Sequence, residues 1–183
     1  MTDLTQTDLV GDGPNARQAD PGGADPATPG RQLLGWRERL ALPQLGIDRL
    51  RAKLDTGARS SSLHVDTLET FQRDGAVWLR FAVSVRHRQQ LPALLCEAPA
   101  LDRRTVTDTG GHRAARWFIR TDVLLAGERF AIDISLTNRR HMLFPMLLGR
   151  SALHGRFAVD PALSYTQPRP SPARPLPPLS EPP

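Results

Sequence analysis

The sequence predicts a mainly β domain, on two observations. Apolar and polar side chains alternate over residues 77–85 and again over 130–136, a period of two that is typical of strands with one buried face. Turn signals separate such stretches, among them Asp74-Gly75 and Ala126-Gly127-Glu128. Short strands divided by turns of this kind are typical of a closed or sandwiched all-β domain.

Several strands and one helix are predicted in chain order. The strands cover 50–54, 77–85, 94–97, 117–125 and 130–136, the last two joined by the tight turn at 126–128. Residues 107–112, which contain Gly110-Gly111, are expected to form a polar hairpin tip. The one expected helix runs from Ser151 to Gly155, with Ser151 as its N-terminal cap.

Proline and glycine divide the chain into a domain and two tails. Of the 17 prolines, four lie in residues 1–30 and eight in 166–183, and neither segment has enough apolar surface to fold. The part between them, 31–165, is long enough to form one hydrophobic core without a disulfide or metal. We expect a disordered Gly/Pro/Asp-rich tail, a single domain over 31–165, and a disordered Pro-rich tail.

The positive charge of the predicted domain bears on which class of partner it binds. The predicted domain has 21 basic and 13 acidic side chains, an excess that either nucleic acid or an acidic peptide could match. The basic residues are dispersed arginines without interleaved aromatic residues, and Lys53 is the only lysine in the chain. This pattern disfavours nucleic acid and is compatible with acidic peptide partners.

No membrane or secretory segment is expected. The apolar stretch 142–148 contains Pro145 and is far shorter than the roughly 20 residues of a membrane span. The first residues are polar and acidic, unlike a secretory signal. A single cysteine, Cys96, cannot form an internal disulfide, which fits a reducing compartment, and we expect a cytoplasmic protein.

The segment most informative about chemistry is Asp55-Thr56-Gly57, directly after the predicted strand 50–54. A carboxylate at the end of a rigid strand is well placed for catalysis, and Gly57 permits a sharp turn and the close approach of another backbone. The hydroxyls of Thr56 and Ser60 can hold the carboxylate and its loop, in which Ala58 also lies. The tripeptide alone is a weak signal, because Asp108-Thr109-Gly110 repeats it.

A second segment strengthens the signal. Leu147, Leu148, Gly149 and Arg150 form an apolar-apolar-Gly-Arg stretch that leads into the predicted helix. Together the two segments resemble the retropepsin-like aspartic proteases. The resemblance implies that Asp55 is catalytic and that the 147–149 strand packs beside the Asp55 loop. It also implies that Gly149 lets this strand and the loop cross closely. Arg150 is expected to anchor the helix and the loop.

A closer resemblance covers most of 34–165. Six motifs occur in the order seen in one bacterial family: Gly35-Trp36-Arg37-Glu38, Leu42-Pro43-Gln44-Leu45-Gly46-Ile47, the stretch 52–64 around Asp55, Leu136-Thr137-Asn138-Arg139, 146–150 and Phe157-Ala158-Val159-Asp160-Pro161. The chain resembles the ATP-dependent zinc protease family, a retropepsin-like group often encoded beside or fused to ATP-grasp glutamate ligases. Arg39 is a departure, since that family usually has Trp there. The resemblance implies a single-lobed retropepsin-like β-barrel with one short C-terminal helix, and a ligase as candidate partner.

The residues support neither zinc nor ATP in this chain. Zinc hydrolysis requires a His-Glu-x-x-His helix or a comparable cluster, whereas the five histidines are scattered with no pair four residues apart. There is no Gly-rich phosphate loop, and the only lysine lies in a predicted strand. We therefore expect no metal and no cofactor, and any ATP dependence would come from a partner ligase.

Three further residues have competing interpretations. Asp108 could belong to a second catalytic loop, as in two-lobed pepsins, but a second apolar-apolar-Gly strand is missing and the domain is too short for two lobes. Residues 107–112 are instead a candidate for a flap over the substrate. Arg59 is a candidate substrate contact or a solvated arginine, and His64 a candidate substrate contact or a hydrogen-bonded structural residue.

One catalytic aspartate per chain predicts a homodimer. Aspartic protease chemistry uses two carboxylates that share a proton, so a single-lobed chain needs Asp55 from two copies on a two-fold axis. The first hypothesis is an aspartic endopeptidase that acts on peptide or protein substrates as a homodimer. The alternative is a catalytically weak module that binds peptide, acidic or glutamylated, and regulates an ATP-grasp glutamate ligase.

Overall fold

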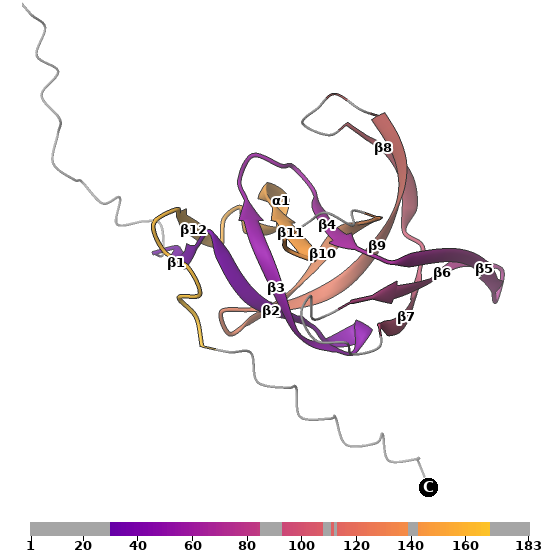
Figure 1. Cartoon of the computed structure of the whole chain (residues 1–183), viewed down its shortest axis with the longest axis horizontal. Coiled ribbons are helices and arrows are strands. Elements are labelled where there is room, and N and C mark those ends of the chain that lie inside the picture. Colours follow the sequence, from indigo (N-terminus) through magenta and orange to yellow (C-terminus); the bar gives the residue numbers. More distant parts are fainter. Residues whose placement is uncertain (1–29, 85–92, 108–110, 112, 139–142, 169–183) are drawn as a thin grey trace, which may run out of the picture. The chain divides into compact units, whose positions relative to one another are not determined.

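The protein is described by a computed structural model that covers residues 30–84, 93–107, 111, 113–138 and 143–168. Apart from Gly30, these residues lie in the unit Arg31–Pro183, one of two into which the chain divides. Figure 1 shows strands almost throughout this unit. In order the elements are β1 (Gln32–Gly35), β2 (Arg37–Leu42), the 3-10 helix η1 (Pro43–Leu45), β3 (Ile47–Asp55), β4 (Ser61–His64), β5 (Thr67–Arg73), β6 (Ala76–Val83), β7 (Leu94–Pro99), β8 (Asp102–Thr107), β9 (Arg113–Leu125), β10 (Glu128–Thr137), β11 (Met146–Gly149), α1 (Arg150–Leu153) and β12 (Phe157–Asp160).

Seven strands form the main sheet, in the order β10-β4-β11-β3-β2-β9-β8, and β9 also pairs with β10. Strands β2 and β9 meet at one register pair, Ala41 opposite Leu124. In the pairing of β2 with β3 the register shifts between Leu40 and Leu42, beside this junction. The mainly β class is confirmed, and the expected closed barrel is corrected to a sheet that one residue pair holds at this junction.

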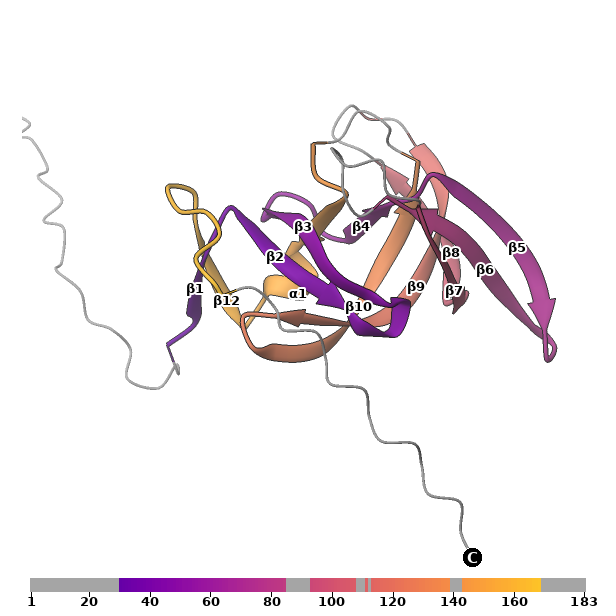
Figure 2. The same cartoon turned by 60° about the horizontal axis from the view of Figure 1, so that its bottom comes forward.

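Two smaller sheets accompany the main one. Strands β5, β6 and β7 form an antiparallel sheet, and β1 pairs with β12 in parallel. The two small sheets lie at opposite sides of the main sheet (Figure 2). Because β1 and β12 lie near the two ends of the described chain, their pairing fixes those ends to each other.

Within the described residues the predicted strands are confirmed, and so are the turns at Asp74-Gly75 and Ala126-Gly127. Leu79, Phe81 and Val83 of β6 are fully buried, and their neighbours along the strand are more exposed, as the period of two predicted. The turn between β9 and β10 has φ of 55° at Ala126 and 81° at Gly127, the pair of positive angles that suits a tight hairpin. Asp74-Gly75 between β5 and β6 has the same property. Seven further strands, β1, β2, β4, β5, β8, β11 and β12, complete the sheets, of which the sequence analysis expected only β11.

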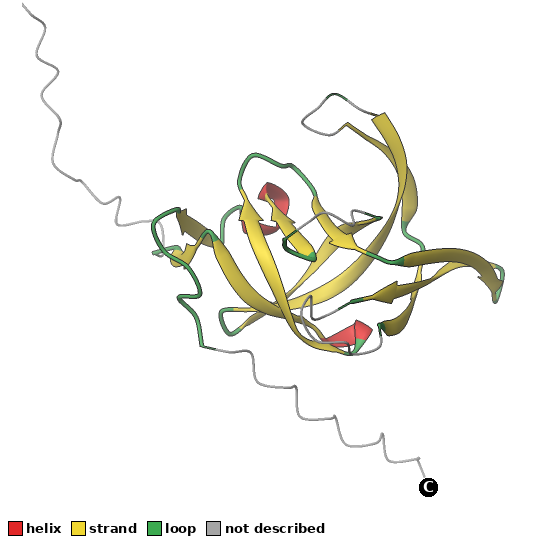
Figure 3. Ribbon diagram, in the orientation of Figure 1, coloured by secondary structure: helices red, strands yellow, loops and turns green. Residues whose placement is uncertain are grey.

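The hydrophobic core takes side chains from both larger sheets. Leu50, Leu63, Ile119 and Ile134 of the main sheet and Phe81 of β6 belong to one buried cluster. Both sheets therefore depend on the same burial of apolar surface and form a single domain. Secondary structure is assigned in Figure 3, where helix is confined to α1 and η1 within the described residues.

The short helix differs from its prediction at both ends. Helix α1 covers Arg150–Leu153, whereas Ser151–Gly155 was expected, and its N-terminal cap is Gly149 without any side-chain bond from Ser151. Its first amides find other acceptors: Arg150 N donates to Ala58 O at 2.8 Å and Ser151 N to Arg59 O at 3.1 Å. Loop carbonyls thus accept the hydrogen bonds of the first helical amides, in place of the serine side chain that was expected as the cap.

The segment after β12 runs beside β2. Trp36 N donates to Leu163 O at 3.0 Å, and Tyr165 N donates to Arg37 O at 2.8 Å. The fully buried Glu38 accepts bonds at Oε1 from the backbone and hydroxyl of Thr166, at 2.9 and 2.7 Å. Thr166 lies just beyond the predicted boundary at 165, and the domain limits and both tails stay predictions.

Two expectations concern residues outside the description. Val85 and most of the predicted hairpin tip 107–112, the flap candidate, are among them. Among the helices of the described residues, none has the length and apolar character needed to span a membrane.

The crossing of β1 by the C-terminal segment requires a glycine at position 35. A Cβ on Gly35 would lie 2.5 Å from Leu163 O and 2.6 Å from Ser164 Cα, and both contacts are with backbone. We predict that Gly35→Ala lowers the free energy of unfolding by about 1–3 kcal/mol, as overpacking does elsewhere. Urea denaturation measures it. Gly30→Ala is the control, because a Cβ there meets nothing within 4 Å; equal stabilities for the two variants would contradict the prediction.

Candidate active site

Asp55 is the last residue of β3 and lies where the strand turns into an exposed loop. Its Oδ1 accepts hydrogen bonds from the backbone amides of Gly57 and Ala58, both at 3.2 Å. About a quarter of the side chain is exposed. The carboxylate is therefore oriented by its own loop through one oxygen, and its other oxygen, Oδ2, is left for chemistry.

Strand β11 passes directly beside this loop. It pairs with β3 in parallel, with Gly149 opposite Asp55, and with β4 in antiparallel on its other side. A Cβ on Gly149 would lie 2.5 Å from the Ser60 carbonyl carbon and oxygen. The expected close crossing of strand and loop is thus present, and only glycine fits at that point.

The hydroxyl that joins the two segments belongs to a residue that the sequence analysis did not select. Gly149 N donates to Ser61 Oγ at 3.1 Å, and Ser61 is fully buried. Ser60 contributes its backbone at the crossing, and its hydroxyl has no hydrogen bond within the described part of the chain. The run of three serines at 60–62 was visible, but only the position of the crossing decides which one points inward.

Arg150 lies at the start of α1 and holds the loop as expected. Its backbone amide donates to Ala58 O at 2.8 Å, and its guanidinium Nη1 reaches Thr56 O at 3.4 Å. The side chain is exposed. Thr56 therefore meets the rest of the site through its carbonyl, and its hydroxyl has no hydrogen bond among the described residues.

Leu147 and Leu148 occupy opposite faces of β11. Leu148 is fully buried in the core and lies opposite Leu54 of β3. Leu147 is half-buried and lies opposite Lys53. The apolar-apolar-Gly stretch therefore anchors one side chain in the core and leaves the other on the face that carries Asp55.

Two candidate substrate contacts have different surroundings. Arg59 is exposed on the loop, where its carbonyl accepts a bond from Ser151. His64 ends β4, its amide donates to Pro145 O at 2.7 Å, and its Nε2 lies 3.5 Å from Asp66 Oδ1. These contacts agree with the structural interpretation of His64, while Arg59 is free to meet solvent or a ligand.

A cation that the sequence analysis did not place in the site contacts Asp55. Lys53 Nζ lies 3.5 Å from Asp55 Oδ2. The two residues are two apart on β3, so both side chains project from the same face of the sheet. Lys53 is about half exposed. A signal was available, because Lys53 is the only lysine in a chain with 23 arginines.

That face carries further positive charge, here called the basic face and defined by Arg37, Arg39, Arg51 and Lys53. Arg37 lies opposite Lys53 and Arg39 opposite Arg51 across the β2–β3 pair. The three arginines stack on rings, the shortest contact being Arg39 over Tyr165 at 4.1 Å, and within the described residues none has an ion pair. Their charge is therefore uncompensated beside Asp55.

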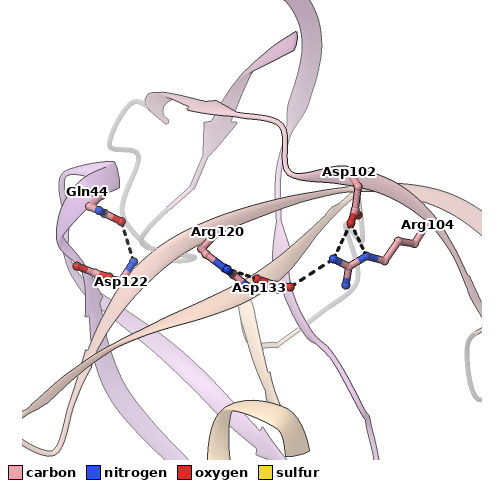
Figure 4. Close-up of polar contacts among 6 residues, drawn as sticks. All are labelled: Gln44, Asp102, Arg104, Arg120, Asp122 and Asp133. Carbon is pink, nitrogen blue, oxygen red and sulfur yellow. Dashed lines mark hydrogen bonds and ion pairs between the residues drawn. The ribbon is translucent and has the colours of Figure 1, made fainter. Parts of the chain in front are cut away.

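Several arginines elsewhere on the domain form ion pairs. Figure 4 shows Asp133 of β10 between Arg120 and Arg104, at 2.9 and 3.3 Å, with Arg104 also bound to Asp102. The hydrogen bond that Arg104 donates to Asp102, with a further one to Asp133, raises the pKa of the Arg104 guanidinium above its usual range. The same view shows Gln44 accepting a bond from Asp122 N at 2.8 Å. These contacts compensate part of the positive charge on β8–β10, whereas the arginines of the basic face have no such ion pair within the described residues.

The described residues provide neither a reactive cysteine nor a metal site. Burial raises the pKa of the Cys96 thiol to about 11, which keeps it protonated at neutral pH, and its Sγ lies 3.4 Å from Leu45 O. Among the residues that the structure describes, no group of three or more His, Cys, Asp or Glu side chains could hold a metal ion. The described donors around Asp55 do not fit a zinc site.

Known sequences match most of the chain. A family model described as "RimB-like: Retropepsin-like aspartic endopeptidase RimB" matches residues 33–170. Three proteins, each named "Probable alpha-L-glutamate ligase", are similar over 133 residues, or 73% of this chain: 37% identical in Desulfotalea psychrophila, 39% in Parasynechococcus marenigrum and 34% in Shewanella pealeana. The matched part spans only 28–29% of their length.

A solved structure agrees with the fold. The crystal structure of a Legionella pneumophila protein of unknown function superposes with a TM-score of 0.63, at 30% identity, covering 75% of this chain and 98% of that one. The expected retropepsin-like fold is confirmed. The zinc protease name is corrected, because the matching family is described as an aspartic endopeptidase.

The bond between Ser61 and Gly149 should stabilise the crossing of strand and loop. Ser61→Ala leaves the Gly149 amide buried without its acceptor, at a cost of about 1–3 kcal/mol in the free energy of unfolding. Ser60→Ala, one residue away and without such a bond, should change it by less than about 0.5 kcal/mol. Chemical denaturation of both variants tests this, and a Ser61→Ala variant as stable as Ser60→Ala would contradict it.

Proposed function

The chain belongs to the RimB-like family of retropepsin-like aspartic endopeptidases, and on that premise we propose that it hydrolyses peptide bonds with water activated by Asp55. The observation that carries the proposal is the geometry of the carboxylate. Asp55 ends a strand, two loop amides hold Oδ1, and Gly149 packs against the loop behind it. This arrangement orients a partly exposed carboxylate without neutralising it by burial, as a general base requires.

The reaction needs a second acidic group, and we propose that a second copy of the chain supplies it. An ionised Asp55 takes a proton from water while the water oxygen attacks the scissile carbonyl. A protonated carboxyl facing it donates to the carbonyl oxygen, since two carboxylates at close range cannot both stay ionised. The sequence has two Asp-Thr-Gly tripeptides, but the 147–149 apolar-apolar-Gly strand that follows them pairs with β3 beside Asp55. The complete pair of carboxyl groups would therefore be built from Asp55 of two copies.

The substrate that the basic face fits is an acidic peptide. The arginines of the basic face have no ion pair within the described residues, whereas Arg104, Arg120 and Arg129 on β8–β10 are paired. An extended peptide bound at Asp55 would pass along this face, and its carboxylates would meet guanidinium groups in bidentate geometry. Arg59, exposed on the adjoining loop, is a further candidate contact.

A second candidate function is a peptide-binding module that regulates an ATP-grasp glutamate ligase and turns over little or no peptide. It is favoured by the relatives named as glutamate ligases, of which the matched part covers less than a third. Formation of a complex with such a ligase, with no cleavage of any peptide, would favour the module over the peptidase. In either role we propose action in the cytoplasm and without a cofactor, which agrees with the free, buried Cys96.

Loss of the Asp55 carboxylate should abolish hydrolysis. We predict that Asp55→Asn lowers kcat for an acidic peptide by at least about 1,000-fold, because the amide cannot take the proton from water. Cleavage of fluorogenic peptides measures it. Asp48→Asn is the control, an exposed aspartate on the same strand that should keep full activity.

The same proteins decide the source of the second carboxyl. Light scattering should find a homodimer for the wild-type chain, and mixing wild type with an excess of Asp55→Asn should suppress activity by forming mixed pairs. Hydrolysis that is unaffected by Asp55→Asn would overturn the peptidase. A stable, fully active monomer would overturn the homodimer and leave the role of Asp55 intact.

Charge reversal on the basic face should weaken acidic substrates selectively. For Arg51→Glu we predict a KM about tenfold higher for a Glu-rich peptide, with kcat unchanged, because opposite charges now repel. A neutral peptide and the charge-preserving Arg51→Lys should show little change. The KM for the Glu-rich peptide on wild type should also rise with salt. Equal effects on acidic and neutral peptides would contradict the acidic substrate.

A further inference from the structure

The environment of Asp55 is asymmetric. Two backbone amides contact Oδ1, and within the described part of the chain the one cation in contact with the carboxylate, Lys53, contacts Oδ2. Because Oδ1 is held by the loop, Oδ2 is the oxygen available to water and to a peptide carbonyl. Lys53 therefore stands on the reactive side of the carboxylate.

We propose that Lys53 is a second catalytic residue of this chain, whose ammonium stabilises the negative charge that develops on the scissile carbonyl oxygen. The proposal rests on the peptidase function proposed for Asp55. Lysine has three N–H donors, and the contact with Asp55 Oδ2 uses at most one of them. At 3.5 Å that contact is long for a hydrogen bond, so the ammonium is close to the carboxylate without being locked to it.

The neighbouring side chains leave this position to Lys53. Arg37, its partner across β2, has its guanidinium over the rings of Trp36 and Tyr165, at 4.8 and 5.1 Å. On the other side Leu147 of β11 carries no charge. The compact, mobile ammonium of lysine can follow an oxygen whose position changes during the reaction, whereas a stacked guanidinium cannot. The presence of the single lysine at this point, in a chain otherwise supplied with arginine, fits that requirement.

The step balances within the site. A water O–H bond breaks and its proton passes to Asp55 Oδ2, while the water oxygen bonds to the carbonyl carbon. The electron pair of the C=O bond moves onto its oxygen, where the Lys53 ammonium, which keeps its proton, and the facing protonated carboxyl stabilise it. The C–N bond then breaks, and Asp55 returns the proton to the leaving nitrogen. Groups aimed at developing charge in this way contribute to kcat more than to KM.

Steady-state kinetics on full-length variants test the proposal. Lys53→Met should lower kcat by about 100-fold with KM changed less than about threefold, the effect of losing one oxyanion donor. Lys53→Arg keeps the charge and should recover part of the loss. Arg49→Met is the matched control, an exposed cation on the same face of β3, and should keep kcat within about twofold. Thermal unfolding checks that all variants are folded.

The double variant Asp55→Asn/Lys53→Met separates a shared step from a structural effect. It should be no slower than Asp55→Asn alone, because both groups act on the same transition state. An inactive Asp55→Asn together with a Lys53→Met that matches Arg49→Met would overturn the role of Lys53 and leave the peptidase standing. It would reduce the contact to an ordinary exposed ion pair. A wild-type level of hydrolysis by Asp55→Asn, or no hydrolysis by the wild-type chain, would overturn both proposals.

Discussion

The site depends on one crossing, the passage of β11 behind the loop that follows Asp55. Gly149 lies opposite Asp55 in the sheet, its missing side chain leaves room for the Ser60 carbonyl, and its amide is bound by Ser61. The next two amides of the chain, from Arg150 and Ser151, bond to loop carbonyls of Ala58 and Arg59. The backbone amides of three consecutive residues therefore hold the loop and the start of β4, one through the Ser61 hydroxyl and two through loop carbonyls.

Charge is distributed to suit this site. On β8–β10 the ion pairs around Asp133 compensate part of the positive charge. On β2 and β3 the arginines stack on aromatic rings, which holds their planes in place while their charge stays unpaired within the described residues. Because exposed ion pairs add little stability, this difference has a small effect on folding, and it leaves guanidinium groups on the face of the sheet that carries Asp55.

Sequence patterns predicted the parts of the molecule that depend on local rules. Alternation located β6 and β10, and Ala126-Gly127 located the hairpin between β9 and β10, since period and turn chemistry act within a few residues. The motif at 147–150 predicted the crossing at Gly149. The junction of β2 and β9 through the single pair of Ala41 and Leu124, and the choice of Ser61 over Ser60, were not predicted, because each depends on register between strands far apart in sequence. The cap of α1 was wrong for the same reason: its acceptors come from a loop about 90 residues earlier, beyond the reach of local propensity.

The position of Lys53 shows where a motif stops being informative. The motif specifies Asp55, Thr56 and Gly57, whose backbone and carboxylate are tied together at Oδ1. The Asp-Thr-Gly tripeptide does not include residue 53, which belongs only to the longer stretch 52–64, and alternation along β3 places that side chain on the same face, at Oδ2. The fold would tolerate any strand-forming residue there, since the position is half exposed and outside the core. Chains with the same tripeptide can thus share the loop and differ in the charge of the side chain that contacts Oδ2. The chemistry of such a site therefore depends on the residue two positions before the aspartate as well as on the aspartate.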